Sequence, residues 1–134
     1  MATAILASGL LSGNRTIYNQ GNVNTIGVGV YWDSACTNNV SSINWGSLEP
    51  GSNVDRTVYV QNEGNVPMTL SLTEGNWDPT SASTHISLDW DREGSVIDAG
   101  SVLQTVLTLS VSSEVDGITS FSFDLTITGT ESAS

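Results

Sequence analysis

The residues of this chain whose types and spacing could do chemistry are acidic, and they gather in one short stretch. From residue 89 onward, carboxylates occupy alternate positions near a turn, and the candidate ligands are Asp89, Asp91, Glu93 and Asp98. Several oxygens close together are what a hard cation such as calcium requires. The twelfth position of the run, where a calcium-binding EF-hand loop has its bidentate Glu, is Gly100, and the flanks have strand character. We therefore favour a solvated hairpin, with a calcium site as the alternative.

Other catalytic or metal chemistry has little support in the sequence. A Cys-His nucleophile would require Cys36 and His85, each the single residue of its type, to meet in space beside an orienting group. The same two residues are too few for a zinc site. Asp89 and Asp91 would share one solvated strand face, where neither pKa is raised for acid catalysis. We expect a non-catalytic protein without a cofactor.

The charge balance limits the partners of the chain. Its formal net charge is −11, with 14 acidic residues, three arginines and no lysine among 134 residues. Nucleic-acid binding needs clustered cations that neutralise phosphates, so this class of partner is excluded, and an anionic membrane surface is not expected. Only 13% of the residues are charged, and a surface of Ser, Thr and Asn is typical of exported β-proteins. We expect an extracellular or cell-surface location.

The elements that must position these residues are β-strands. Apolar side chains recur at every second position in four runs: Val28, Val30 and Trp32; Ile86, Leu88 and Trp90; Leu103, Leu107, Leu109 and Val111; and Phe121, Phe123, Leu125 and Ile127. With a short strand at residues 43–45 and a central strand pair, the total is about seven strands separated by turn signals. The pattern predicts an all-β, immunoglobulin-like or jelly-roll antiparallel β-sandwich over residues 23–134.

The central strand pair has the clearest alternation. Residues 57–61 and 68–73 each alternate apolar and polar side chains with the period of a half-buried strand. Between them, residues 62–65 read Asn-Glu-Gly-Asn, which are residue types that close tight turns. We expect a β-hairpin whose inward side chains include Val58, Val60, Leu70 and Leu72.

The four tryptophans raise the question of sugar binding, because an exposed indole can stack on a pyranose ring. Trp32 and Trp90 share the parity of core residues, and Trp45 lies in a short alternating run, so these three are assigned to the core. Trp77, beside the predicted turn at residues 75–79, is the candidate for exposure.

The first 22 residues form an N-terminal apolar extension. Residues 2–11 are apolar without a basic flank and are about half the length that spans a bilayer, so no membrane span is expected in this chain. An apolar run of this kind must be buried somewhere, and the residues that would insert into another subunit are Ala4, Ile5, Leu6, Leu10, Leu11 and Ile17. A remnant of a leader or anchor explains the same residues equally well. Two sequons, at Asn14 and Asn39, mark candidate glycosylation sites.

Within residues 27–128, four blocks carry a family resemblance: VYWDSACTN, LEPGS, VYVQNEGN and SFSFDLTIT. They resemble the secreted immunoglobulin-like domains of archaeal surface proteins and, more distantly, the TasA/camelysin group of extracellular fibre subunits. The resemblance implies subunits that polymerise when an N-terminal segment of one pairs with an open sheet of the next. The protease activity that the name camelysin implies does not carry over, because the chain has no H-E-x-x-H motif.

The expected function is therefore that of a self-assembling structural subunit of a surface or matrix filament, whose partners are copies of itself. The alternative is a monomeric cell-surface adhesion or carbohydrate-binding module, for which glycans would be the partners. The first function requires a segment that is unsatisfied in the monomer, and the second requires an exposed aromatic platform.

Overall fold

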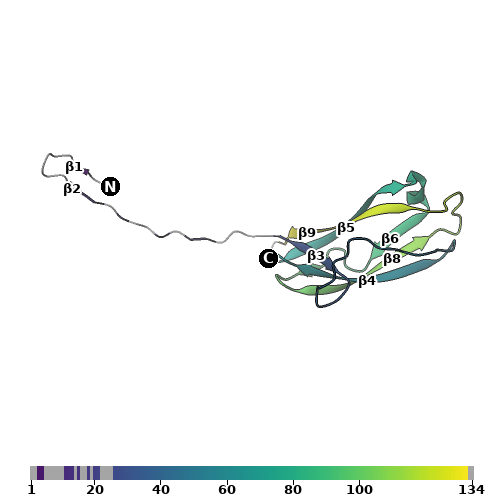
Figure 1. Ribbon diagram of the computed structural model, residues 1–134, viewed down its shortest axis with the longest axis horizontal. Coiled ribbons are helices and arrows are strands. Elements are labelled where there is room, and N and C mark those ends of the chain that lie inside the picture. Colours follow the sequence, from purple (N-terminus) through teal and green to yellow (C-terminus); the bar gives the residue numbers. More distant parts are fainter. Residues whose placement is uncertain are drawn as a thin grey trace.

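The protein is a β-sandwich of two antiparallel sheets (Figure 1). The computed structural model describes residues 3–4, 11–13, 15, 18, 20–21 and 26–132. The four-stranded sheet has the order β3-β4-β8-β6, with bounds Val28–Tyr31, Asn53–Asn62, Val102–Val111 and Ile86–Trp90. The three-stranded sheet has the order β7-β5-β9, with bounds Val96–Ile97, Met68–Asp78 and Ser122–Glu131. The predicted all-β antiparallel sandwich of about seven strands is confirmed.

The described residues of the N-terminal extension contribute no strand to either of these sheets. Its two strands, β1 (Thr3–Ala4) and β2 (Leu11–Ser12), pair only with each other, so that Ala4 lies opposite Leu11. The remaining residues predicted for assembly and the first sequon lie outside the described residues: Ile5, Leu6, Leu10, Ile17 and Asn14. Within the described parts of the chain, no helix is long and apolar enough to cross a membrane.

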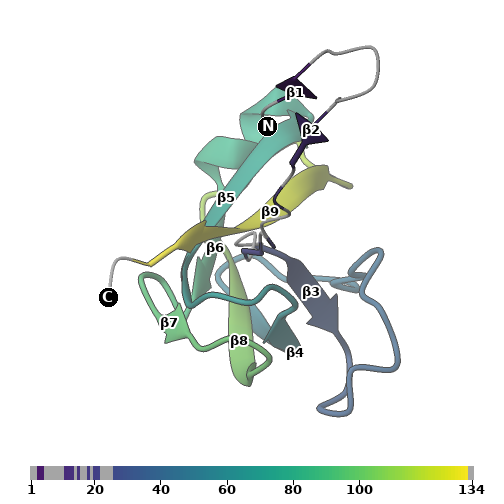
Figure 2. The ribbon, with the colours of Figure 1, turned by 90° about the vertical axis from the view of Figure 1, so that its left-hand side faces the viewer.

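The core lies between the two sheets, which Figure 2 shows as separate layers. Its centre is the long β4–β8 pair, where Val58, Leu107 and Leu109 are fully buried. Each such side chain stabilises the fold by about 1.5–3 kcal/mol. The predicted inward face is confirmed for the four-stranded sheet and for Leu70. On the three-stranded sheet several predicted core residues are only partly buried, namely Leu72, Phe121, Phe123 and Leu125.

The central strand pair is not a hairpin, and that expectation is wrong. β4 belongs to the four-stranded sheet and β5 to the three-stranded sheet, so residues 63–67 carry the chain across the sandwich from one layer to the other. A hairpin and a crossing of this kind bury the same apolar faces. The alternation of residues 57–61 and 68–73 could not distinguish them, because it records which side chains point inward and not which strand is the neighbour.

The crossing is held by Asn62, whose side chain is fully buried. Its Nδ2 donates hydrogen bonds to the carbonyl oxygens of Val66, at 2.8 Å, and Ile97, at 3.0 Å. Its Oδ1 accepts a hydrogen bond of 2.9 Å from the backbone N–H of Gly64. The Asn62 backbone also exchanges two hydrogen bonds with residues 100–101. One side chain thus ties the end of β4 to the crossing loop and to β7 in the opposite sheet.

Two tryptophans have the opposite placement from the one predicted. Trp77 lies within β5, which continues through the expected turn, and a register shift between Gly75 and Asp78 lets its ring stack on Phe123 with 4.3 Å between centroids. A bulge of this kind turns a side chain to the other face of a strand. Trp32 follows the last residue of β3 and is 39% exposed. Because β3 ends at Tyr31, the alternation of inward and outward side chains along this strand does not extend to Trp32.

The short strand predicted at residues 43–45 is not formed, although Trp45 is buried as expected at 8% exposure. The segment pairs with no strand among the described residues. It is held instead by Arg56, whose Nη2 donates a hydrogen bond of 3.1 Å to the Asn44 carbonyl oxygen. The Arg56 guanidinium also lies 5.5 Å from the centre of the Trp45 ring, within the range of a cation–π contact.

Replacing Asn62 tests whether this side chain holds the crossing. Asn62→Ala leaves one buried and one partly buried carbonyl group without their donor, and a buried orphaned group costs about 1–3 kcal/mol. We expect the free energy of unfolding, measured by urea denaturation, to fall by at least about 2 kcal/mol. The matched control is Asn53→Ala, at the exposed start of the same strand, which should change it by less than about 0.5 kcal/mol. Equal effects of the two substitutions would contradict the role assigned to Asn62.

Candidate functional site

The least complete part of the sandwich is the edge formed by β9. This strand pairs with β5 on one side, and no described strand pairs with its other side. Its inward side chains are only partly buried, although they belong to the apolar core: Phe121, Phe123, Leu125 and Ile127. A long edge strand with a half-exposed apolar face is a template for pairing with another chain.

Two cavities follow this edge and form one groove between β9 and residues 40–48, which we call the β9 groove. The larger cavity has a volume of about 660 Å³ and the smaller one about 400 Å³. They share Ser42, Ile43 and Trp45 as lining residues, so they adjoin one another. The larger one reaches Phe121 and the smaller one extends to Ile127.

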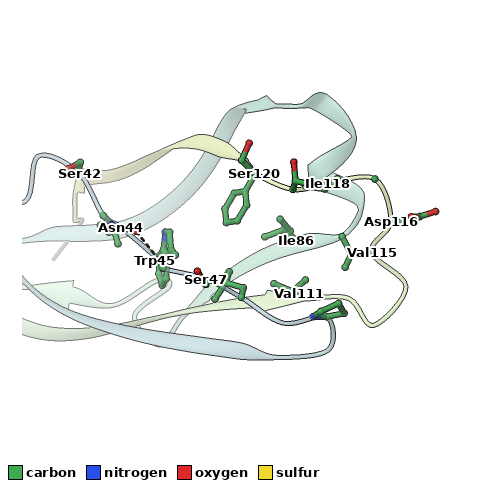
Figure 3. Close-up of a pocket in the computed structure, with 17 residues that line it drawn as sticks. Ser42, Asn44, Trp45, Ser47, Ile86, Val111, Val115, Asp116, Ile118 and Ser120 are labelled. Atoms are coloured by element: carbon green, nitrogen blue, oxygen red, sulfur yellow. Dashed lines mark hydrogen bonds between the residues drawn. The ribbon is translucent and has the colours of Figure 1, made fainter.

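Figure 3 shows the larger cavity. Residues 42–48 form one wall, residues 115–121 form the other, and Ile86 and Val111 lie between them from the four-stranded sheet. The first wall is shaped by a hydrogen bond of 2.9 Å from the Gly46 backbone N–H to Asn44 Oδ1, at a position where Gly46 has φ = 78°. Glycine adopts this conformation at little cost, so it allows the chain to bend around Trp45.

The groove has an apolar floor of core side chains and walls that carry many serine, threonine and asparagine residues, and it suits an extended occupant. From residue 121 to residue 127 a strand extends about 20 Å, so the groove accommodates about seven residues. Among its lining residues, only Asp116 and Asp124 are ionisable. The Asp124 carboxylate accepts a hydrogen bond of 2.7 Å from Asn76 Nδ2. The free edge of β9 offers backbone hydrogen bonds, and the floor offers apolar contacts; these are the two terms by which a strand is added to a sheet.

The sequence pattern predicts the strand that forms this groove but not the groove itself. The run of same-parity residues from Phe121 to Ile127 looks like any core strand, and nothing in it marks the strand as an edge. The segment at residues 40–48 was read partly as a strand, whereas it is an extended wall.

The acidic run at residues 89–98 does not form a cation site in the structure, since the described residues hold no cluster of three metal-ligating side chains. Asp91 Oδ1 accepts a hydrogen bond of 3.0 Å from the backbone N–H of Val106. Glu93 Oε1 accepts hydrogen bonds from the backbone N–H of Leu72, at 3.1 Å, and from Trp90 Nε1, at 2.8 Å. The two carboxylates therefore stabilise the β6–β7 turn against both sheets.

The other two carboxylates of the run, Asp89 and Asp98, are exposed. Local repulsion is offset in part by Arg92, whose Nε lies 3.9 Å from Asp91 Oδ1 and donates a hydrogen bond of 2.8 Å to the Gln104 carbonyl oxygen. The connection from β6 to β7 is not the solvated hairpin that the sequence favours, because β6 belongs to the four-stranded sheet and β7 to the three-stranded sheet.

Cys36 and His85 are placed apart by the fold. Cys36 follows β3 and His85 precedes β6, and these strands are the opposite edges of the four-stranded sheet, with β4 and β8 between them. Burial, together with the nearby Asp33 carboxylate, raises the pKa of the Cys36 thiol, which lowers its nucleophilicity at neutral pH.

The loop that contains Trp32 is ordered by Asp33. The Asp33 carboxylate accepts hydrogen bonds from the Thr37 hydroxyl, from the Thr37 backbone N–H at 2.9 Å and from the Asn38 backbone N–H at 3.0 Å. These bonds, that of the Thr37 hydroxyl above all, lower the pKa of the Asp33 carboxyl. The loop presents both Trp32 and the sequon residue Asn39 to solvent.

No family model, curated protein or solved structure matched this chain in the comparisons made with them.

Calcium should leave the thermal stability unchanged, because the Asp91 and Glu93 carboxylates are already engaged by backbone and indole donors. A ligand that binds only the folded state would raise the melting temperature. We expect differential scanning fluorimetry to give the same melting temperature with millimolar calcium and with EDTA. A rise that Asp91→Asn removes would contradict this interpretation.

Proposed function

We propose that this protein is a non-catalytic structural subunit of an extracellular filament, in which each subunit inserts its N-terminal apolar segment into the β9 groove of a neighbour. The observation that carries the proposal is the groove itself. It follows an unpaired strand edge, it is floored by half-buried core side chains, and it has the length of a short strand.

The N-terminal segment has the composition that the groove requires. Residues 2–11 carry no charge and include two pairs of large aliphatic residues, Ile5-Leu6 and Leu10-Leu11. Each large aliphatic side chain buried in the groove contributes about 1.5–3 kcal/mol. In the described structure, β1 and β2 pair with one another and not with the sandwich, so they do not fill the groove of their own subunit. This pairing must open before the segment can enter a groove as one strand.

The same exchange explains why assembly would continue beyond a dimer. Each subunit has one donor segment and one acceptor groove, and these are different surfaces. A contact between different surfaces is heterologous and generates an open filament unless the rotation closes a ring. The backbone edge of β9 and its half-exposed apolar face are then covered in every subunit except the one at the end.

Further features support an extracellular setting for this filament. The surface is acidic and rich in uncharged polar residues, and it contains no lysine. Asn39, in the sequon Asn39-Val40-Ser41, is exposed, so it is accessible for glycosylation in an exported protein. The resemblance to secreted immunoglobulin-like surface domains and to TasA-like fibre subunits agrees with this setting.

A second candidate function, that of a carbohydrate-binding module, is favoured by Trp32. Its side chain is 39% exposed, next to the hydrogen-bonded Asp33 loop, which holds its backbone in place. An exposed indole on an ordered loop is the platform that stacking on a sugar ring requires.

Charged residues in the donor segment should abolish assembly without unfolding the sandwich. The double variant Leu6→Asp and Leu10→Asp places two carboxylates in a groove whose lining residues include no cation, where burying an unpaired charge is costly. We expect this variant to remain monomeric by analytical ultracentrifugation and to show no filaments by negative-stain electron microscopy. Its circular dichroism should match that of the wild type.

The matched control carries the same two charges just after the segment, as Tyr18→Asp and Gln20→Asp, and should still form filaments. A second donor-segment variant deletes residues 2–13. We expect this variant to remain monomeric as well. If either donor-segment variant forms filaments with the morphology of the wild type, the proposed function is wrong.

For the second candidate, affinity electrophoresis through gels that contain polysaccharide gives a direct test. We expect Trp32→Ala to lose any retardation that the wild type shows, because the stacking surface is removed, while Tyr18→Ala, an exposed aromatic outside this loop, keeps it. If wild-type mobility does not depend on the polysaccharide, Trp32 is not a sugar platform.

A further inference from the structure

The chain enters and leaves the sandwich at the same end, beside the crossing loop at residues 63–67 (Figure 1). The Gly27 carbonyl oxygen accepts a hydrogen bond of 2.8 Å from the backbone N–H of Glu63. At the other terminus, the backbone N–H of Ser132 donates a hydrogen bond of 2.9 Å to the Pro67 carbonyl oxygen. We call this the crossing end. The N-terminal extension of each subunit therefore joins its sandwich at the crossing end.

The β9 groove is widest at the opposite end, which we call the open end. Its larger cavity is lined there by residues 42–50 and by residues 115–121, the loop that leads into β9. The hydrogen bond of 2.9 Å from the Gly51 backbone N–H to the Val111 carbonyl oxygen joins the start of β4 to the end of β8 at this end. β9 thus runs from the open end, at Ser122, to the crossing end, at Glu131.

At the crossing end the two sheets close the groove. Gly129 of β9 packs so tightly that a Cβ atom at this position would lie 3.0 Å from Val28 Cγ2 and would also clash with Met68. The absence of a side chain at Gly129 therefore lets β9 approach β3. A segment that occupies the groove has a free path to solvent at the open end and is blocked toward Val28.

From these positions we infer the direction of the exchange: the donated segment runs antiparallel to β9 of its neighbour, with its N-terminus toward the crossing end and residues 12–13 at the open end. This inference rests on the proposed function. It adds a fourth strand to the sheet β7-β5-β9 and makes that sheet antiparallel throughout.

The opposite direction is disfavoured by where the chain must go next. In a parallel arrangement, residues 12–13 would lie at the closed end, against the contact between Gly129 and Val28, and the chain would have no exit toward its own sandwich. In the antiparallel arrangement residues 12–13 lie at the open end, where the chain can continue toward its own sandwich.

The connecting stretch is long enough for this geometry. Residues 13–25 can span at most about 45 Å when fully extended. The longest strand of the sandwich, β5, has 11 residues and extends about 36 Å. The stretch therefore links the crossing end of one subunit to the open end of the next, and successive sandwiches follow one another end to end with the same polarity.

Cross-linking in the full-length protein tests the direction. In a Cys36→Ser background, Ser12→Cys is combined either with Ser122→Cys, at the open end of β9, or with Thr128→Cys, near its closed end. A third variant combines Thr3→Cys with Thr128→Cys. A bismaleimide that spans about 8 Å reaches a diagonal neighbour in a sheet but not the roughly 20 Å that separates the two β9 positions. We expect the 12–122 and 3–128 pairs to give a ladder of multimers on denaturing gels, and the 12–128 pair to give monomers.

The outcomes separate the direction from the proposed function. If filaments form and the ladder of multimers appears with the 12–128 pair instead, the donated segment runs parallel to β9. That result overturns the inferred direction and leaves segment exchange intact. If filaments form but none of the three cysteine pairs gives a ladder of multimers, the segment does not lie beside β9. That result overturns the inference. Cross-links confined to single chains would show that the segment fills its own groove, which overturns both proposals, as does a protein that never assembles.

Discussion

The crossing of the chain between layers at Asn62 is the constraint on which the rest of the structure depends. Because its buried amide is satisfied by carbonyl groups of the crossing loop and of β7, the chain after β4 is committed to the opposite sheet. β5 then pairs with β9 and β7 instead of β4. An unsatisfied amide in that position would be costly, so the hydrogen bonds of this single side chain fix which strands become neighbours.

The topology that follows leaves the three-stranded sheet one strand short beside β9. Its inward residues, Phe123 and Leu125 among them, contribute to the core while remaining partly exposed. In a protein that functions as a monomer, such an edge is a liability that bulges, charges or covering loops usually remove. In the proposed filament it is the acceptor site, and the energy of completing the core becomes the energy of assembly.

The residues with the most reactive chemistry have structural roles. Glu93 joins the β6–β7 turn to β5 and to Trp90, and Asp33 orders the loop after β3. The pKa of Asp33 is lowered and that of Cys36 is raised, in each case by its local surroundings. These carboxylates accept hydrogen bonds from backbone N–H groups that no strand satisfies. This use of acidic side chains agrees with a chain that has few cations to pair with them.

The sequence by itself determined six of the seven strands of the sandwich, most of their inward faces and the burial of Trp45, because alternation reports directly on which side of a strand faces the core. It also marked the N-terminal run as a segment in need of an apolar site. Only the tertiary structure decided strand neighbours: the replacement of a hairpin by the Asn62 crossing, the inward turn of Trp77 through a bulge, the exposure of Trp32 and the open edge of β9. The physical reason is that periodicity is a property of one strand, whereas neighbours and edges depend on hydrogen bonds between residues far apart in the chain.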